Sequence, residues 1–251
     1  MPVTRVVIVP AAPLLVPEAS AAQPDHLRDA VGELRRTVTT ALASLPEQGT
    51  ALLLDSGAES LVHDAAMASL AGYGLRQVTA SISIDPHLIT AVSARGQAPR
   101  VRSDRLDGDP AVLALLLAQS RPGLQLAPIT IPAGASAAGL HDIAVGLTAA
   151  ADSLPGPVYV IATGDLAATL DTTSPGYEIA GARDWDAGVV EAVRQHDPVA
   201  LGEFGPAAAV RFQARGWAPI TVALLLAEAH RCALSQITYL APRGVGQLIA
   251  H

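Results

Sequence analysis

The stretch VYVIATGDLAATL, residues 158–170, decides how this chain folds. Its first six residues are apolar, aromatic or β-branched, which is typical of a buried strand. The strand is predicted to end at Thr163-Gly164-Asp165, where Gly164 lets the backbone turn sharply. Asp165 is expected to cap this turn, with ligand binding as the alternative. Because ligands gather at the carboxyl ends of strands in open α/β sheets, this junction is a candidate site.

The rest of the chain alternates between strand-like and helical patterns. Apolar residues three and four apart, at Val31, Leu34, Val38 and Leu42, predict one amphipathic helix. The alternation predicts an α/β fold with a central mostly parallel or mixed sheet and helices on both faces, formed by residues 1–251 as one domain. The expected strands are residues 5–9, 50–55, 78–84, 125–131, 158–163 and 236–240, and the expected helices are residues 25–45, 59–70, 110–119, 137–154, 185–195 and 220–232.

Two Asp-Pro pairs predict where helices begin. Asp109-Pro110 and Asp197-Pro198 each combine a residue that caps helices well with proline, which suits the first helical position. We therefore expect the carboxylates of Asp109 and Asp197 to accept hydrogen bonds from the first turns of their helices.

The composition excludes several classes of function. The chain has a formal net charge of −7 and only 16% charged residues, with no basic cluster. Such a chain is a poor partner for nucleic acid or for an anionic membrane surface. No stretch reaches the roughly 18 apolar residues that a membrane-spanning helix needs, and the N-terminus lacks the pattern of a signal peptide. We expect a soluble, cytoplasmic protein that binds neither nucleic acid nor membranes.

A second predicted strand end carries polar side chains. In Asp55-Ser56-Gly57-Ala58-Glu59, either Asp55 or Ser56 is expected to cap the helix predicted over residues 59–70. Among the seven histidines, His87 directly follows a predicted strand, and a surface position at a helix start is favoured for it over a role as metal ligand. No motif for zinc, phosphate or dinucleotide binding occurs.

Four segments in order along the chain resemble class III extradiol ring-cleavage dioxygenases of the B-subunit superfamily. The family's opening strand and His-Pro loop are similar to VIVPAAPLLVPE, residues 7–18. Its strand followed by Gly-Asp-Leu-Ser-His is similar to residues 158–170, and its next helix, which closes on Asp-Pro, to GARDWDAGVVEAVRQHDPVAL, residues 181–201. Its Gly-Trp-x-Pro helix is similar to RGWAPITVALLLAEA, residues 215–229. The resemblance implies the dioxygenase fold.

The resemblance also implies an iron site whose ligands this chain lacks. Two His and one Glu hold Fe(II) in such enzymes, and another His acts as acid and base. The first ligand falls on Ala11 and the acid/base position on Ala168, while Ser56-Gly57-Ala58 offers no His for the second ligand. No Asp or Glu stands just before Gly216, where the Glu ligand is expected, and no His precedes Pro110. We therefore expect no metal and no cofactor.

Three functions follow as hypotheses. The first is a non-catalytic or reassigned homologue that keeps the fold for binding or assembly, with a small neutral or weakly acidic organic ligand or a second copy of the chain as partner. The second is a metal-independent hydrolase or lyase in the same cleft, and a metalloenzyme with relocated ligands around His87 is a third reading. The residues expected to line the cleft are Ala11, Ala12, Pro13, Asp55, Ser56, Gly57, Glu59, Gly164, Asp165, Ala167 and Ala168.

Overall fold

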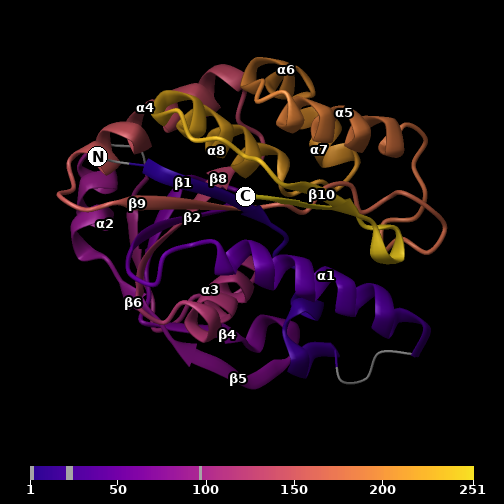
Figure 1. Cartoon of the computed structure of the whole chain (residues 1–251), viewed down its shortest axis with the longest axis horizontal. Coiled ribbons are helices and arrows are strands. Elements are labelled where there is room, and N and C mark those ends of the chain that lie inside the picture. Colours follow the sequence, from indigo (N-terminus) through magenta and orange to yellow (C-terminus); the bar gives the residue numbers. More distant parts are fainter. Residues whose placement is uncertain (1–2, 21–24, 96–97) are drawn as a thin grey trace.

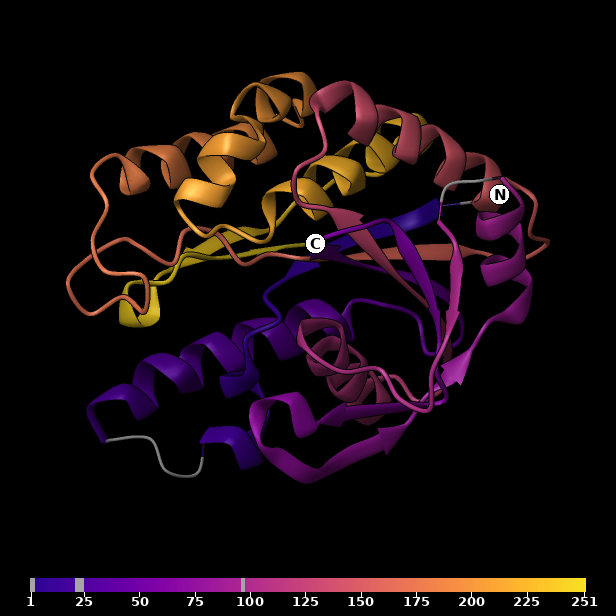
Figure 2. The same cartoon turned by 180° about the vertical axis from the view of Figure 1, so that it is seen from behind.

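A nine-stranded mixed sheet runs through the molecule, with helices on both of its faces (Figures 1 and 2). The structure is a computed structural model, and it describes residues 3–20, 25–95 and 98–251. Two clusters of buried apolar side chains, one on each face of the sheet, form the core. The expected α/β fold with a mostly parallel, mixed sheet is confirmed.

Four neighbouring parallel strands form the centre of the sheet. In spatial order they are β1 (Val3–Val9), β9 (Val158–Thr163), β2 (Gly49–Gly57) and β8 (Leu124–Pro132). β9 is buried along its whole length, because helices cover both of its faces. The carboxyl ends of these strands therefore meet along one edge of the sheet.

Shorter strands extend the sheet on both sides. Antiparallel pairing adds strands beyond β1 and beyond β8, and the last strand on the β8 side is parallel to its neighbour. The added strands are β11 (Gln247–Ala250), β10 (Ile237–Leu240), β3 (Leu61–Asp64), β7 (Arg100–Arg102) and β6 (Ser83–Ile84), the last of which pairs with β8.

The helices divide between the two faces. On the upper face in Figure 1 lie α4 (Ala137–Asp152), α5 (Ala182–Arg194), α6 (Pro198–Glu203), α7 (Gly205–Arg211) and α8 (Trp217–His230). α2 (Pro86–Ala94) packs into the same core cluster at one end of the sheet. On the lower face lie α1 (Asp25–Ala43), α3 (Asp109–Ser120) and the hairpin of β4 (Met67–Leu70) and β5 (Leu75–Ser81).

The apolar periodicity of α1 matches its packing. Its apolar face is buried against the lower core cluster, as predicted, and consists of Val31, Leu34, Val38 and Leu42.

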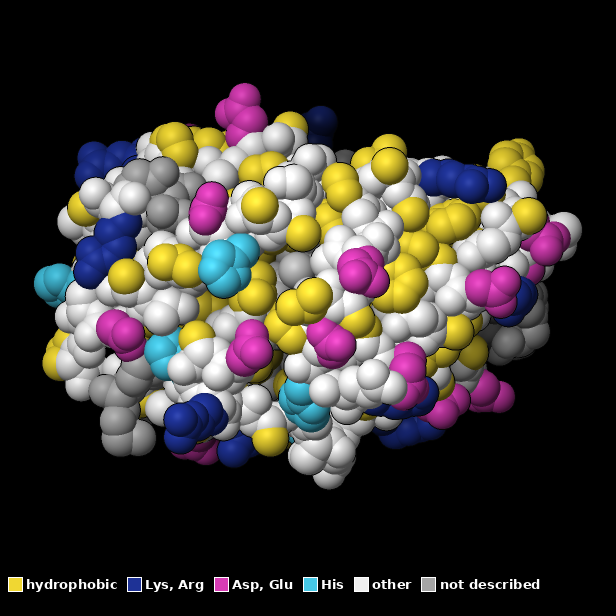
Figure 3. All heavy atoms as spheres, turned by 90° about the horizontal axis from the view of Figure 1, so that it is seen from above, with side chains coloured by type: hydrophobic (Ala, Val, Ile, Leu, Met, Phe, Trp, Pro, Cys, Tyr) yellow, Lys and Arg dark blue, Asp and Glu magenta, His cyan; other side chains and the backbone are white. Residues whose placement is uncertain are grey.

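Viewed from above, Asp and Glu side chains are scattered between apolar ones on the face formed by the upper helices (Figure 3). Within the described part of the chain, no helix is long and apolar enough to cross a membrane.

The helix predicted over residues 59–70 is wrong. This segment forms β3 and β4, because Leu61 and Val62 pair with β8 and residues 67–70 pair with β5. Helix propensity of the alanines here is overridden by these tertiary pairings. The strand predicted over residues 78–84 is interrupted at Ile82, so that β5 joins the hairpin and only β6 joins the main sheet.

The two Asp-Pro pairs differ in role. Asp197 caps α6 as expected, since its Oδ1 accepts hydrogen bonds from the N–H groups of Val199 and Ala200. The expectation for Asp109 is wrong: Gly108 is the N-cap of α3, with φ of 75°, and Asp109 is the first helical residue. The carboxylate of Asp109 is thereby free to point elsewhere.

Candidate functional site

The ends of β1, β9 and β2 bring together residues that are far apart in the sequence. Ala11 follows β1, Asp165 follows β9, and Asp55 lies near the end of β2. The backbone N–H of Ala11 donates a hydrogen bond to Asp165 Oδ2 at 2.7 Å. The loop after β1 and the loop after β9, which were both expected to line one cleft, therefore meet at one edge of the sheet.

Asp165 connects loops instead of capping its own turn, which corrects the expectation from sequence. Its Oδ2 also accepts a hydrogen bond from Thr163 Oγ1 at 2.8 Å. Burial raises the pKa of Asp165, against the opposing effect of the Ala11 N–H. Gly164 is required for close approach, because a Cβ there would lie 2.1 Å from the carbonyl oxygen of Leu248.

A cavity of about 290 Å³ opens beside these loops, and it is here called the large chamber to distinguish it from a smaller cavity that shares Arg215. Ala11, Ala12, Pro13, Asp165 and Ala168 line the large chamber, as the sequence predicted. Most of the surface of its wall is apolar, although half of the remaining lining residues are polar or charged. The other lining residues are Leu14, Asp109, Leu166, Pro175, Gln213, Arg215, Pro242, Arg243, Val245 and Gln247.

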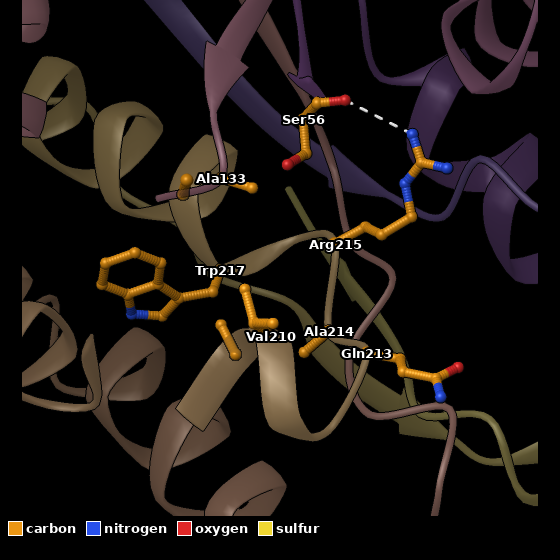
Figure 4. Close-up of a pocket in the computed structure, with 9 residues that line it drawn as sticks. Ser56, Ala133, Val210, Gln213, Ala214, Arg215 and Trp217 are labelled. Carbon is orange, nitrogen blue, oxygen red and sulfur yellow. Dashed lines mark hydrogen bonds between the residues drawn. The ribbon is translucent and has the colours of Figure 1, made fainter. Parts of the chain in front are cut away.

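Arg215 stands at the centre of the site. Its Nη1 lies 2.9 Å from Asp109 Oδ2, and its Nη2 lies 3.7 Å from Asp55 Oδ2. Nη2 also donates to the backbone oxygen of Ser56 at 3.3 Å, the dashed contact in Figure 4. Tyr73 donates its hydroxyl to Asp109 Oδ1, so that each oxygen of this carboxylate has a partner.

The carboxylates Asp55, Asp109 and Asp165, here called the carboxylate cluster, surround this one guanidinium. Asp55 is 1% exposed, and neither of its carboxylate oxygens has a hydrogen-bond partner among the described residues. Burial, followed by the charge of Asp109, raises the pKa of Asp55 to about 7, while Arg215 opposes the shift. Burial alone would lower the pKa of Arg215, but Asp109 and Asp55 raise it.

A smaller cavity of about 100 Å³, the small chamber, also borders Arg215 (Figure 4). Arg215 and Gln213 line both chambers. Trp217 forms part of the wall, and its indole N–H donates to the carbonyl of Leu201 at 2.9 Å. The other lining residues are Ser56, Ala133, Ala209, Val210, Ala214 and Ala218.

Other candidates from sequence lie outside the large chamber. Glu59 is exposed, and Gly57 pairs with Pro132 of β8. Asp55 and Ser56 cap no helix, because none follows them directly. His87 is exposed in the first turn of α2, whose cap is Asp85, as was favoured for it. It follows β6, which pairs with the amino end of β8, and is therefore remote from the site.

The iron site implied by the resemblance does not fit these residues. Ala11 and Ala168 line the large chamber but have no donor atom, and Arg215, just before Gly216, supplies a positive charge instead of a carboxylate. Within residues 3–20, 25–95 and 98–251, no group of three or more His, Cys, Asp or Glu side chains has the arrangement of a metal site.

Sequence reasoning missed Arg215, Asp109 and Tyr73 as members of the site. A signal for Arg215 was present, because it directly precedes the Gly-Trp-x-Pro segment. Tyr73 gave none, since it lies in the short helix η3 (Ala71–Tyr73), directly after the wrongly predicted segment 59–70.

Comparisons with known proteins inform only the fold. No family model matches the sequence, and no curated protein matches it. Among solved structures, the chain is similar to the uncharacterized protein JW3007 from Escherichia coli K12, with a TM-score of 0.55 and 14% sequence identity over 98% of both chains. At this identity the likeness extends to the fold alone.

Proposed function

We propose that this chain is a dioxygenase-like protein that has exchanged iron chemistry for the binding of a small organic molecule in the large chamber. The observation that carries the proposal is the position of Arg215. Its guanidinium lies among the carboxylate cluster, next to the loop of Ala11, where the resemblance would put a metal ion and its ligands. A protein cation therefore stands in for the metal charge, beside a cavity with a largely apolar wall.

The dimensions of the large chamber support the binding of a small molecule. Its volume of about 290 Å³ lies at the lower end of the range for small-molecule pockets, and its few polar groups converge between apolar walls. The wall contains backbone that is held in place, because Ala11 and Asp165 are joined by a hydrogen bond. A wall that is already ordered reduces the conformational entropy that the protein itself loses when a ligand binds.

The alternative of a metal-independent hydrolase has weaker support. Ser56 lines the small chamber, but no imidazole from the described residues lines either chamber. A serine nucleophile needs an adjacent base, and the buried Asp55 has no hydrogen bond to the Ser56 hydroxyl. Binding without turnover is the simpler role for these residues.

A ligand screen with a blocked chamber tests the proposal. Small organic compounds would be screened by thermal shift on the wild type, on Ala168→Phe, which fills the chamber, and on Ala149→Phe, a matched change on the exposed face of α4. Hits are expected to bind the wild type and Ala149→Phe but not Ala168→Phe. Hits that bind all three proteins equally would place the binding site elsewhere and refute the proposal.

A further inference from the structure

The candidate site contains more carboxyl groups than positively charged groups. Asp55, Asp109 and Asp165 lie around a single guanidinium, that of Arg215. Burial, followed by the charge of Asp109, raises the pKa values of Asp55 and Asp165, so that a further positive charge beside these carboxyls would favour their ionised forms. Arg243 also lines the large chamber, but its side chain is exposed to solvent, where its charge is screened.

We propose that the large chamber binds a small organic cation, an amine on an apolar body, whose ammonium group lies between Asp109 and Asp165. This inference rests on the proposed function, because it assigns a ligand class to the same cleft. The proposed cation differs from the neutral or weakly acidic ligand expected from sequence. The sequence did not reveal that Asp109 lines the large chamber.

The two carboxylates retain acceptor capacity for such a ligand. A carboxylate offers about four lone-pair sites. Asp109 uses one site on each oxygen, for Tyr73 and for Arg215. Asp165 accepts from the backbone N–H of Ala11 and from the Thr163 hydroxyl, both at Oδ2. Each carboxylate can therefore accept a further N–H bond without losing a partner.

Gln247 is an independent sign of a missing polar partner. It lines the large chamber, is 2% exposed, and its Oε1 has no hydrogen-bond partner among the described residues. The Gln247 side chain lowers the pKa of Asp165, so its amide nitrogen lies on the side of that carboxylate. A buried amide oxygen without a partner is costly. An ammonium carries three N–H donors, and Asp109 and Asp165 offer acceptors from the wall to which Gln247 also belongs.

The apolar part of the wall suits a compact hydrocarbon body. Pro13, Leu14, Leu166, Pro175 and Val245 line the chamber, and rigid prolines and branched side chains give it a fixed shape. The chamber is too small for a large ligand, so a ring with a short amine-bearing arm is a suitable probe.

Three probes of similar shape separate charge from hydrophobic binding: 2-phenylethylamine, 2-phenylethanol and 3-phenylpropionate. In isothermal titration calorimetry of the full chain at low salt, the affinity is expected to be highest for the amine, lower for the alcohol and lowest for the carboxylate. The amine should bind about tenfold or more tightly than the alcohol, because it gains charge-assisted hydrogen bonds. Its advantage should decrease with added salt.

Two isosteric variants assign the effect to the carboxylates. Asp165→Asn and Asp109→Asn each remove one negative charge but keep an oxygen acceptor, and either is expected to abolish most of the preference for amine over alcohol. Asp142→Asn removes the same charge from an exposed position on α4 and should leave that preference unchanged. Circular dichroism would confirm that each variant is folded, and two separate variants keep the test valid if one is not.

The outcomes distinguish this inference from the proposed function. Failure of the amine to bind, or binding no tighter than that of the alcohol or the carboxylate, overturns the cation assignment. The proposed function survives that result if other ligands still depend on an open chamber, as judged with Ala168→Phe. Amine binding that persists in both Asp→Asn variants also overturns the assignment.

Discussion

The backbone N–H of Ala11 and the carboxylate of Asp165 are joined by a hydrogen bond of 2.7 Å, although 154 positions separate them in the sequence. This bond ties the loop after β1 to the loop after β9, two strands that pair in parallel register up to Val9 and Thr163. Because both loops line the large chamber, the bond fixes one side of the candidate site.

Removal of the Asp165 carboxylate should lower stability. In Asp165→Ala, the N–H of Ala11 and the hydroxyl of Thr163 lose their acceptor, which should decrease the free energy of unfolding by about 1–3 kcal/mol. Asp165→Asn retains an acceptor oxygen and should recover most of the loss. Urea denaturation of the three proteins measures the effect, and equal stability of Asp165→Ala and the wild type would contradict it.

Gly216 should tolerate no side chain, for a steric reason. A Cβ at this position would lie 2.8 Å from the carbonyl oxygen of Asp165 and 2.9 Å from that of Thr163, both of which are backbone atoms. Gly216→Ala is expected to destabilise the fold by about 1–3 kcal/mol and to displace Arg215 from Asp109. The control is Gly134→Ala, since nothing lies within 4 Å of a Cβ there. Equal effects of the two changes on thermal unfolding would refute the argument.

Much of the sheet could be predicted, because its central strands are apolar runs that end in recognisable turn residues. β9 was predicted at its observed bounds, since its apolar run ends directly in a Gly-Asp turn. Residues 59–70 were mispredicted, because their pairing partners β5 and β8 are supplied by other parts of the chain. Local propensity carries no information on such partners.

The candidate site was predictable only in part, for a related reason. Ala11, Ala12, Pro13, Asp165 and Ala168 could be assigned because each lies in a loop that follows a strand, in a segment from which the resemblance was inferred. Asp109 begins α3 and Arg215 lies just before α8, on the opposite face of the sheet, so their contact depends on the packing of both faces. Long-range ion pairs of this kind leave no local pattern in a single sequence.

We expect the purified protein to hold no stoichiometric iron and to cleave no catechol. Ala11 and Ala168 lack lone pairs, and the guanidinium of Arg215 would repel Fe(II). The measurement is elemental analysis after anaerobic incubation with Fe(II) and gel filtration, followed by an oxygen-consumption assay with catechols. Iron approaching one equivalent together with ring cleavage would show that other residues restore the site.

The free energy of unfolding should depend on pH because the buried Asp55 has a raised pKa. Its pKa is about 7 in the folded protein, against an ordinary value of 3.8, because it is buried beside Asp109. The charged groups that face it are Asp109 from α3, Asp165 after β9 and Arg215 before α8, with Tyr73 close to the same cluster. A raised pKa means that the folded state holds the proton more tightly than the unfolded state does. Stability should therefore fall as the pH rises from about 4 to about 7.

Asp55→Asn tests this assignment, because it mimics the protonated carboxyl at every pH. The variant should approach the wild type only near pH 4, and its advantage should grow with pH to about 1–4 kcal/mol in free energy of unfolding at pH 8. Asp186, whose pKa is raised to about 6 mainly by burial, contributes a decrease of the same sign below pH 6 in both proteins. The difference between pH 6 and pH 8 thus belongs to Asp55. Urea denaturation across this range measures it, with Asp142→Asn as control, and parallel profiles for wild type and Asp55→Asn would mean that Asp55 stays ionised throughout.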